Sequence, residues 1–445
     1  MSDAPITVTV SAPTNIACIK YWGKASLELN TPINSSVSVT LSQNTLRSVT
    51  TLSIDPSFKS NKLWLNGVEE DVSTSKRFNA CLANCRRLST LPSPTLKASF
   101  VHVSSMNTFP TAAGLASSAA GYAALVTAMS QAFNCKETFP NELSTVARQG
   151  SGSACRSLYG GFVAWRMGGG DEFGRDSKAE QCFDEKHWDI RAVIAVVSDS
   201  KKETSSTGGM VTSVATSPLL SHRASSGLVE ERMAAIEAAY SAKDFPSFGK
   251  LTMQDSNQFH AVCADTYPPI FYMNDTSRGI VNLVHRYNEA KGGVRAAYTF
   301  DAGPNAVVYC EAGDVDEVAA LVLRYYDAEV KDEGDGGGDR ALNFHLKTEI
   351  TKICDVGREG KVVVRGGGAK GSGGVEGLAS PASGGGRTKR FNTVTSADLE
   401  DEDEEENKVR EVKMVYITGV GGGPKVLDNE KEALLNKFGL NCYDP

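Results

Sequence analysis

The residue types best suited to chemistry lie in Pro110–Ala119 (PTAAGLASSA). A glycine-containing loop there runs into a stretch of Ala, Ser and Leu with the composition of a buried helix. Free N–H groups and the positive dipole end at a helix start bind phosphate, and small side chains let an anion approach the backbone. Ser117 or Ser118 would donate to a phosphate oxygen or ligate Mg²⁺. The alternative is a packed helix behind an ordinary loop, because no Walker-type Gly-Lys-Ser/Thr follows.

Other segments carry groups that complement an anion. Gly150–Arg156 (GSGSACR) ends in a guanidinium suited to bidentate binding, and Lys20–Lys24 (KYWGK) holds two lysines. Ser205–Gly209 is a hydroxyl-rich loop, and Asp301 comes directly after a strand, at a turn. Each also has a structural reading, as a flexible turn, a surface strand end, a linker or a local cap. Together, two anion-binding loops, two lysines, an arginine and an aspartate favour nucleotide-dependent phosphoryl transfer to an anionic small molecule.

Interleaved strands and helices must position these groups. Alternating β-branched residues and apolar runs predict strands, and helical spacing of apolar residues predicts helices. An Asn66-Gly67 pair predicts a hairpin turn, and the fully apolar segment Ala192–Val197 predicts a central strand. The predicted strands are Ile6–Val10, Ser36–Leu41, Arg47–Ile54, Lys97–Val103, Phe162–Arg166, Ala192–Val197, Val294–Phe300, Ala306–Tyr309 and Val412–Ile417. The predicted helices are Lys76–Leu88, Ala112–Met129, Asn141–Arg148, Leu228–Met253 and Val315–Tyr326. The pattern indicates an α+β protein with domains 1–190 and 191–445.

The second domain contains a segment of different composition, residues 331–411. Sixteen of the 42 glycines lie in Gly334–Gly386, and an acidic run follows at 398–406. Such a stretch cannot bury enough apolar surface to offset its backbone entropy, so we predict a disordered insertion. The formal net charge of the chain is −7, and the eight acidic residues of that run contribute −8. The rest of the chain therefore has a net charge of +1.

Composition excludes several classes of protein. A nearly neutral body lacks the basic excess of a nucleic-acid binder, and no apolar run is long enough to span a membrane. Ten dispersed cysteines without a C-x-x-C pair indicate a reducing compartment, and six histidines show no zinc-site spacing. The first residues show no secretory signal. We therefore predict a soluble cytoplasmic protein with a small-molecule substrate and with no nucleic-acid or membrane partner.

Six segments carry a family resemblance. Pro110–Ala119 resembles the phosphate loop of the galactokinase/homoserine/mevalonate/phosphomevalonate kinase (GHMP) superfamily. The resemblance covers roughly residues 5–330 and 412–425, and it narrows to the diphosphomevalonate decarboxylase family. The matching segments are Asn15–Lys24, Asn34–Gln43, Phe109–Gly121, Gly150–Trp165, Ile270–Asp275 and Tyr298–Asn305.

The resemblance implies a fold and an activity. The implied fold is the GHMP kinase fold, with an N-terminal ribosomal-S5-like domain, a C-terminal ferredoxin-like domain and the active site in the cleft between them. The implied reaction is ATP-dependent decarboxylation of (R)-5-diphosphomevalonate to isopentenyl diphosphate, with release of ADP, phosphate and CO₂. This reaction belongs to the mevalonate pathway of isoprenoid and sterol biosynthesis. ATP as co-substrate, Mg²⁺ and a homodimer are implied as well.

The resemblance also implies residue roles. Asp301 accepts the proton of the substrate C3 hydroxyl, Arg156 engages the substrate carboxylate and phosphates, and Asn15 orients that arginine. Lys20 adds positive potential near Asp301. Substrate binding is implied for Tyr21, Trp22, Gly23, Lys24, Arg77, Ser151, Gly152, Ser153, Ala154, Cys155, Arg156 and Thr207. ATP binding is implied for Pro110, Ala112, Ala113, Gly114, Leu115, Ala116, Ser117, Ser118 and Ala119, with Ser118 as the metal ligand.

Two alternatives compete with this interpretation. A GHMP-type small-molecule kinase would phosphorylate its substrate without decarboxylation, and its phosphate loop would be the same. A catalytically inactive binding protein would use the acidic segment as a partner tail. Asp301 together with Arg156, Asn15 and the YWGK segment favours the decarboxylase over both.

Overall fold

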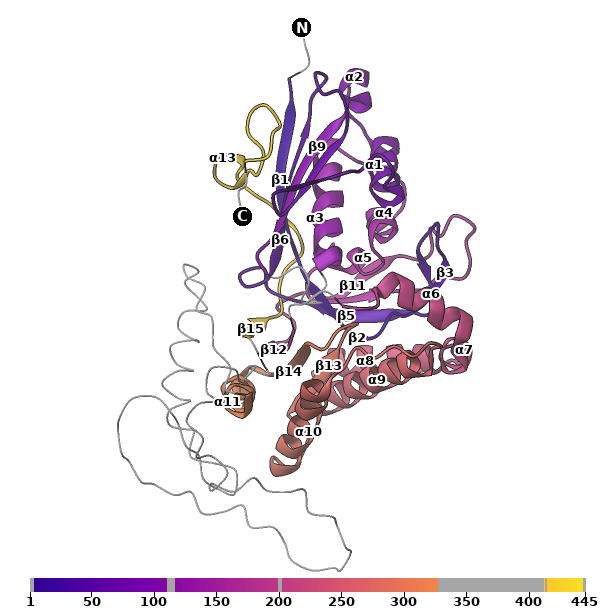
Figure 1. Cartoon of the computed structure of the whole chain (residues 1–445), viewed down its shortest axis with the longest axis vertical. Helices are drawn as coiled ribbons and strands as arrows, with labels where there is room; N and C mark the ends of the chain where they lie inside the picture. Colours follow the sequence, from indigo (N-terminus) through magenta and orange to yellow (C-terminus); the bar gives the residue numbers. More distant parts are fainter. Residues whose placement is uncertain (1–3, 110–116, 199–201, 327–411, 413, 443–445) are drawn as a thin grey trace, which may run out of the picture.

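Four sheets form the strand framework in the part of the chain that the structure, a computed structural model, describes: residues 4–109, 117–198, 202–326, 412 and 414–442. The largest sheet and its helices occupy one end of the molecule, and a layer of helices occupies the other (Figure 1). The first sheet has the order β16-β1-β6-β9-β7-β8, the second β11-β10-β5-β2 and the third β13-β14-β12-β15. Strands β3 (Lys24–Ser26) and β4 (Thr31–Pro32) form a two-stranded ribbon.

The first sheet is covered on both faces. Alternate residues of each strand point to opposite faces, so Leu52 and Ile54 of β6 enter the core with Phe78 of α1, whereas Thr51 faces the other way. On that other face, Thr51 Oγ1 accepts the Leu434 N–H at 2.8 Å. The sheet is β1 (Ile6–Pro13), β6 (Arg47–Ile54), β7 (Lys62–Leu65), β8 (Val68–Glu70), β9 (Val101–Asn107) and β16 (Lys425–Val426). Its helices are α1 (Lys76–Leu88), α2 (Pro94–Ala98), α3 (Ser117–Ala132), α4 (Glu142–Gly150) and α5 (Ala154–Ser157).

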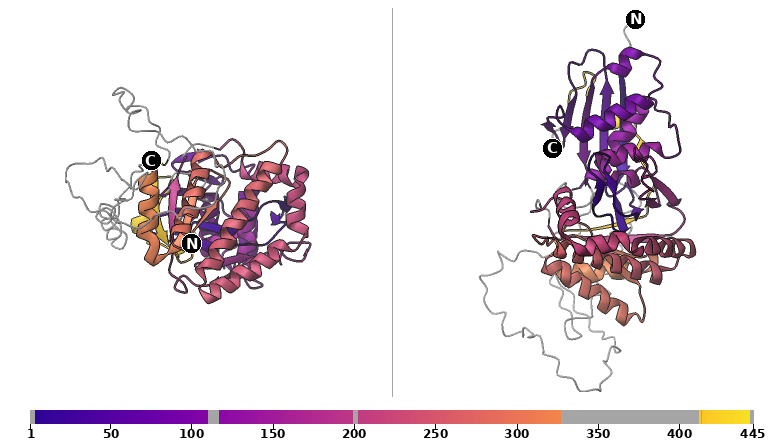
Figure 2. Two further views of the ribbon diagram at one scale, coloured as in Figure 1. Left: turned by 90° about the horizontal axis from the view of Figure 1, so that it is seen from below. Right: turned by 90° about the vertical axis from the view of Figure 1, so that its right-hand side faces the viewer.

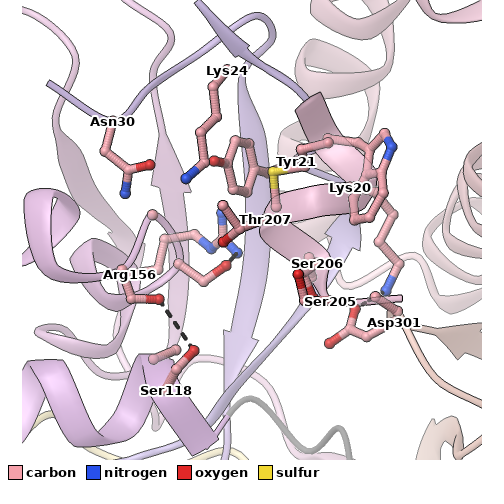
Figure 3. A pocket seen from close by; sticks show the side chains of 18 of the residues that line it. Lys20, Tyr21, Lys24, Asn30, Ser118, Arg156, Ser205, Ser206, Thr207 and Asp301 are labelled. Carbon is pink, nitrogen blue, oxygen red and sulfur yellow. Dashed lines mark hydrogen bonds and ion pairs between the residues drawn. The ribbon is translucent and has the colours of Figure 1, made fainter. Parts of the chain in front are cut away.

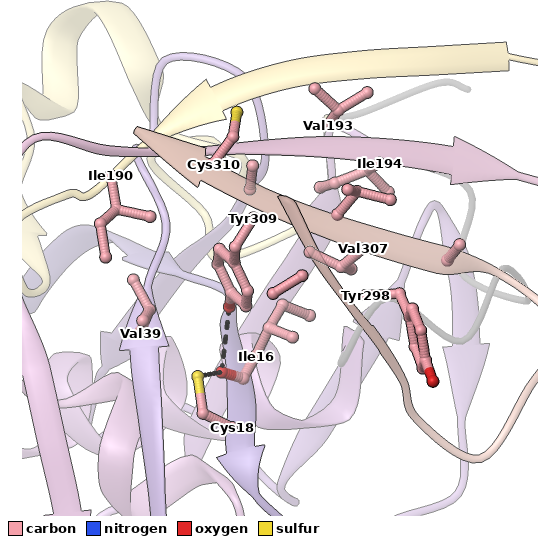
Figure 4. Close-up of a cluster of buried hydrophobic side chains, with 14 of the residues drawn as sticks. Ile16, Cys18, Val39, Ile190, Val193, Ile194, Tyr298, Val307, Tyr309 and Cys310 are labelled. Carbon is pink, nitrogen blue, oxygen red and sulfur yellow. Dashed lines mark hydrogen bonds between the residues drawn. The ribbon is translucent and has the colours of Figure 1, made fainter. Parts of the chain in front are cut away.

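The second and third sheets share one apolar core. Ile16 and Val39 of the second sheet lie near Ile190 and Tyr309 of the third (Figure 4), and the Tyr309 hydroxyl donates to the Ile16 carbonyl at 3.3 Å. The second sheet is β2 (Asn15–Ile19), β5 (Ser36–Thr40), β10 (Phe162–Trp165) and β11 (Ala179–Phe183). The third is β12 (Ile190–Val196), β13 (Ala296–Phe300), β14 (Ala306–Glu311) and β15 (Met414–Gly419). This shared core joins the first and second halves of the chain.

A layer of helices packs beside these two sheets (Figure 2). Asp244 caps the long helix α9 by accepting the Ser247 N–H, and α10 begins with a capping box between Asn274 and Ser277. The helices are α6 (Ser206–Thr216), α7 (Pro218–Ser225), α8 (Leu228–Ala242), α9 (Phe245–Asp265), α10 (Asp275–Ala290) and α11 (Val315–Tyr326). The short helices are η1 (Ala312–Asp314) and α13 (Asn429–Glu432). None of the described helices combines the length and the apolar character needed to cross a bilayer.

Several local predictions are confirmed. The strand Arg47–Ile54 and the helices Lys76–Leu88 and Val315–Tyr326 have the predicted bounds. The turn between β7 and β8 contains Asn66 and Gly67, both with positive φ (48° and 85°), as an Asn-Gly hairpin requires. Strand β12 lies between β14 and β15 and is therefore central, as its composition predicts.

Other local predictions are wrong. The strand predicted from residue 97 begins at Val101, because Ser93 caps α2 and Pro94 occupies its first turn. The predicted loop 150–156 contains the short helix α5. The predicted loop 205–209 is the capped start of α6, because the Ser205 hydroxyl accepts the Gly208 N–H. The predicted insertion 331–411 lies outside the described residues.

The C-terminal residues return to the first sheet. Strand β15 completes the third sheet, and β16 then pairs antiparallel with β1. Along the chain, the strands of the first two sheets come before β12, and the strands of the third sheet run from β12 to β15, before β16 returns to the first sheet.

Candidate active site

A cavity of about 390 Å³ lies where the two halves of the chain meet (Figure 3). It brings together the segments around residues 20, 118, 152, 206 and 301, which are far apart in the sequence. The lining residues are Asn15, Ala17, Lys20, Tyr21, Trp22, Lys24, Asn30, Arg77, Ser117, Ser118, Ala119, Ser151, Gly152, Ser153, Arg156, Lys202, Ser205, Ser206, Thr207, Met210, Phe259, Asp301 and Ala302.

A lysine–aspartate ion pair spans the two halves. Lys20 follows β2 and Asp301 follows β13, and the Lys20 Nζ lies 2.6 Å from Asp301 Oδ1. The lysine side chain is 3% exposed and the aspartate side chain 32% exposed. The carboxylate is therefore neutralised from behind while it stays open to the cavity (Figure 3). An accessible carboxylate in a positively charged wall is suited to accept a proton from a bound substrate.

Arg156 of α5 is a buried cation held by neutral groups. Its Nε donates to Asn15 Oδ1 at 3.2 Å and its Nη2 to Ser153 Oγ at 3.2 Å, and its Nη1 donates to Ser36 Oγ. Asn15 is itself fixed, because its Nδ2 donates to Ser157 Oγ at 2.7 Å. Burial lowers the pKa of the Arg156 guanidinium. Among the described residues no carboxylate forms an ion pair with it, so an anionic ligand in the cavity would complete its environment.

The start of α3 faces the cavity together with the loop before α5. Ser117, Ser118 and Ala119 line the cavity, and the hydroxyls of Ser118 and Ser151 lie 3.3 Å apart. A helix start presents free N–H groups and a positive dipole end, which favour phosphate. The other ATP-binding residues predicted from the sequence, 110 and 112–116, lie outside the described residues.

Two cations of the first half lie at the far end of the cavity, beside hydroxyl groups of α6. Arg77 of α1 donates from Nη2 to Thr207 Oγ1 of α6 at 2.9 Å, which links the two halves. Lys24 lies nearby, and burial together with the charge of Arg77 lowers its pKa to about 8. Trp22 donates from Nε1 to Ser213 Oγ at 2.9 Å and so anchors this segment to α6. This end of the cavity offers positive charge and hydroxyls to a polyanion.

Three of the predicted binding residues do not line the cavity. Ala154 and Cys155 are fully buried behind the loop, because the turn of α5 directs them into the protein core. Burial raises the pKa of the Cys155 thiol to about 12. Gly23 adopts a φ of +95°, and a Cβ there would lie 2.5 Å from Ile33 Cδ1, so this position shapes the turn that carries Trp22 and Lys24.

The sequence reasoning missed several lining residues, above all Lys202. Its Nζ donates to Ser206 Oγ at 2.9 Å and to the Ala302 carbonyl at 3.1 Å, and burial lowers its pKa. Nothing in the sequence distinguishes Lys202 from a surface lysine. Ser205 and Ser206 carried one usable signal, because a serine before small residues is a helix N-cap pattern. Asn30, whose side chain donates to the Arg148 carbonyl, had no such signal.

Fold and cavity together define a class of protein: an enzyme of the GHMP kinase fold, whose cavity is lined by a helix start from the first half and a carboxylate from the second half. The model of the diphosphomevalonate decarboxylase-like N-terminal domain matches residues 12–179. The model of the mevalonate 5-diphosphate decarboxylase C-terminal domain matches residues 192–363. The chain belongs to the diphosphomevalonate decarboxylase family, whose members are ATP-dependent carboxy-lyases.

Relatives and solved structures agree with this assignment. A diphosphomevalonate decarboxylase of Ganoderma lucidum is 45% identical over 443 residues, which cover 97% of this chain and 98% of the relative. The structure of a mevalonate diphosphate decarboxylase from Trypanosoma brucei has a TM-score of 0.76 at 34% identity, covering 96% of this chain and 100% of that one. The structure of MDDEF in complex with MVAPP, AMPPCP and magnesium has a TM-score of 0.64 at 27% identity, with coverage of 96% and 100%. These matches do not favour the kinase alternative.

Proposed function

We propose that this cavity binds (R)-5-diphosphomevalonate and ATP and converts them to isopentenyl diphosphate, ADP, phosphate and CO₂. The single observation that carries the proposal is the position of Asp301, which is paired with Lys20 in the same cavity as the buried Arg156. A substrate with a carboxylate, a tertiary hydroxyl and a diphosphate matches these groups: a cation for each anion and a base for the alcohol.

The chemistry assigns a task to Asp301. Its carboxylate accepts the proton of the C3 hydroxyl as the oxygen attacks the terminal phosphoryl group of ATP, and ADP leaves. The C3–O bond of the resulting phosphate ester then breaks, the electrons of the C1–C2 bond form the C2=C3 double bond, and CO₂ departs. Lys20 holds the carboxylate in place through the 2.6 Å ion pair. Placement of the base dominates, because phosphoryl transfer depends mainly on positioning and charge neutralisation.

Substrate anchoring falls to the groups on either side of this pair. Arg156, oriented by Asn15, binds the substrate carboxylate with its planar fork. Ser151, Gly152 and Ser153 offer N–H groups and hydroxyls to the diphosphate. Tyr21, Trp22, Lys24, Arg77 and Thr207 complete the diphosphate end. Anchoring both ends of the substrate would fix its C3 hydroxyl beside Asp301.

ATP and Mg²⁺ fit the start of α3. The proposed ATP segment is Pro110–Ala119, and its described part, Ser117–Ala119, lines the cavity. The Ser118 hydroxyl is an oxygen ligand of the kind that Mg²⁺ accepts. Within the described ranges no three His, Cys, Asp or Glu residues gather as a metal site, so nucleotide phosphates and water would supply the remaining ligands. When bound, the ion neutralises the charge of the triphosphate.

One assay tests the function. The protein is supplied with ATP, Mg²⁺ and diphosphomevalonate, and ADP and CO₂ are measured together. We expect equal amounts of both. Release of ADP without CO₂ would identify a kinase, and release of neither would identify a binding protein.

The lowered pKa of Lys24 predicts a pH dependence. A lysine is charged below its pKa, so the charged fraction of Lys24 falls as pH rises through about 8 in the free enzyme. We expect kcat/KM for diphosphomevalonate to fall about tenfold between pH 7 and pH 9, because kcat/KM reports ionisation of the free enzyme. The Lys24→Arg variant should lack this fall, since a guanidinium stays charged throughout this range. An unchanged pH profile in the variant would contradict the role of Lys24.

Assembly, location and domain limits belong to the same proposal. We propose a homodimer, as the family resemblance implies, and sedimentation should give about twice the chain mass of 47.4 kDa. A monomer mass at micromolar concentration would contradict the proposed homodimer.

The cytoplasm is the proposed location, tested by cell fractionation. The proposed domains are 1–190 and 191–445, tested by whether 1–190 folds when expressed with residues 412–445 supplied separately.

A further inference from the structure

Helix α9 contacts the backbone on both sides of the Lys20–Asp301 pair. Asp255 Oδ2 accepts the N–H of Lys20 at 2.6 Å. The next residue, Ser256, accepts the N–H of Phe300 with its Oγ at 3.0 Å, and Phe300 directly precedes Asp301. Two consecutive residues of one helix therefore hold two segments that are far apart in the chain. Neither residue lines the cavity.

Asp255 holds Lys20 as part of a buried ion cluster. Its carboxylate is fully buried and pairs with Arg223 at 2.8 and 2.9 Å and with Arg232 at 2.7 Å. Arg223 Nη2 then donates to the Lys20 carbonyl at 3.1 Å, and Asn34 Nδ2 donates to the same oxygen at 2.9 Å. Both polar backbone groups of Lys20 are thus satisfied by a rigid set of partners. Buried charges with mutual partners have few alternative arrangements.

Ser256 holds the other segment through a single neutral hydrogen bond. It is almost fully buried, and its oxygen meets the last residue of β13. His260, one turn further along α9, packs edge-on against the Phe300 ring at 6.1 Å. Burial, followed by the charge of Lys20, lowers the pKa of His260 to about 4, so this imidazole is neutral at working pH. The helix therefore places Asp301 without adding a second cation beside it.

We propose that Asp255 and Ser256 are positioning residues that set the distance and angle between Lys20 and Asp301. The inference rests on the proposed function, because it assigns the pair a part in the reaction. A fixed pair places the base against the C3 hydroxyl, and small displacements of a reacting group cost rate. Since both anchors lie outside the cavity, they affect the chemical step and leave substrate contacts unchanged.

Ser256→Ala is the better test, because loss of Asp255 would leave two buried arginines without their partner and could unfold the protein. We expect kcat to fall between about 10- and 100-fold, with both KM values within about twofold of wild type. Thr252→Val is the matched control: it removes a fully buried hydroxyl one turn earlier on α9 that has no hydrogen-bond partner among the described residues. The control should keep its kcat and its stability, because its hydroxyl makes no hydrogen bond that valine would lose. Ser256→Thr, which keeps an acceptor oxygen, should recover most of the rate.

A double-mutant comparison separates positioning from a general structural effect. In a Lys20→Met background, Ser256→Ala should lower the residual kcat by less than about twofold, because no pair is left to align. An undiminished further loss would overturn the inference, as would a Ser256→Ala kcat equal to that of Thr252→Val. If the wild-type protein released no CO₂, the proposed function would fall and this inference with it. Wild-type turnover with an unaffected Ser256→Ala enzyme would overturn the inference alone.

Discussion

The Asp301→Asn variant is expected to lose at least about 10³-fold in kcat while it still binds ATP. Asparagine has the same shape and can still accept a hydrogen bond from the Lys20 ammonium, which lies 2.6 Å from the carboxylate in the wild-type protein. The amide cannot accept the proton of the C3 hydroxyl, so the first chemical step loses its base. Turnover is measured as CO₂ release, and nucleotide affinity by titration with a fluorescent ATP analogue.

A matched control tests whether the loss of any one carboxylate charge lowers kcat. Asp275→Asn removes an exposed carboxylate at the start of α10, outside the cavity, and should keep wild-type kcat. If Asp301→Asn retained more than about a tenth of wild-type turnover, Asp301 would not be the base. Loss of ATP binding together with turnover would instead indicate collapse of the cavity.

The Arg156→Lys variant is expected to lose at least about 10²-fold in kcat/KM for diphosphomevalonate. Asn15, Ser36 and Ser153 each accept from a different nitrogen of the guanidinium, and this arrangement fixes its plane. A lysine ammonium reaches fewer of these acceptors and presents a point charge in place of a planar fork. A buried ammonium also loses its proton more readily than a guanidinium does. The measurement is steady-state kinetics with thermal denaturation of the same samples.

Arg166→Lys is the control for this substitution. Arg166 is half-buried and pairs with Glu180 and Glu237, and it does not line the cavity. We expect this variant to keep kcat/KM within about threefold of wild type, because surface ion pairs contribute little. Less than a tenfold loss in Arg156→Lys would mean that the planar fork is not used for substrate. A large loss in both variants would indicate that the arginine substitutions act through folding.

Local sequence patterns predicted much of the secondary structure. Phe78, Leu82 and Cys85 repeat at helical spacing, and α1 buries these three side chains. Asn66 and Gly67 tolerate the positive φ angles that a hairpin turn needs. The errors arose where a capping side chain begins a helix: Ser93 caps α2 where a strand was predicted, and Ser205 caps α6 where a loop was predicted. Such competition depends on small differences in energy that neighbouring residues decide.

Some residues of the candidate site could be predicted from the sequence and others could not. Residue type and order pointed to Asp301, Arg156 and Lys20, because their segments resemble a known family. Two further residues had no local signal: Asp255, which holds the Lys20 backbone, lies in the middle of a helix, and Lys202, which lines the cavity, lies beside another lysine. Similarly, no local sequence pattern predicts that β16, near the C-terminus, pairs with β1, near the N-terminus.

By itself the sequence determined which chemical groups were available and which short segments would form strands or helices, because backbone preferences and apolar spacing act over a few residues. Tertiary structure alone decided which of those groups meet. Lys20 and Asp301 are 281 positions apart and lie 2.6 Å from one another because the second and third sheets bury one common core and α9 holds both strand ends. Burial of apolar surface is non-directional and depends on the whole fold. The distance between Lys20 and Asp301 therefore cannot be predicted from any single segment of the sequence.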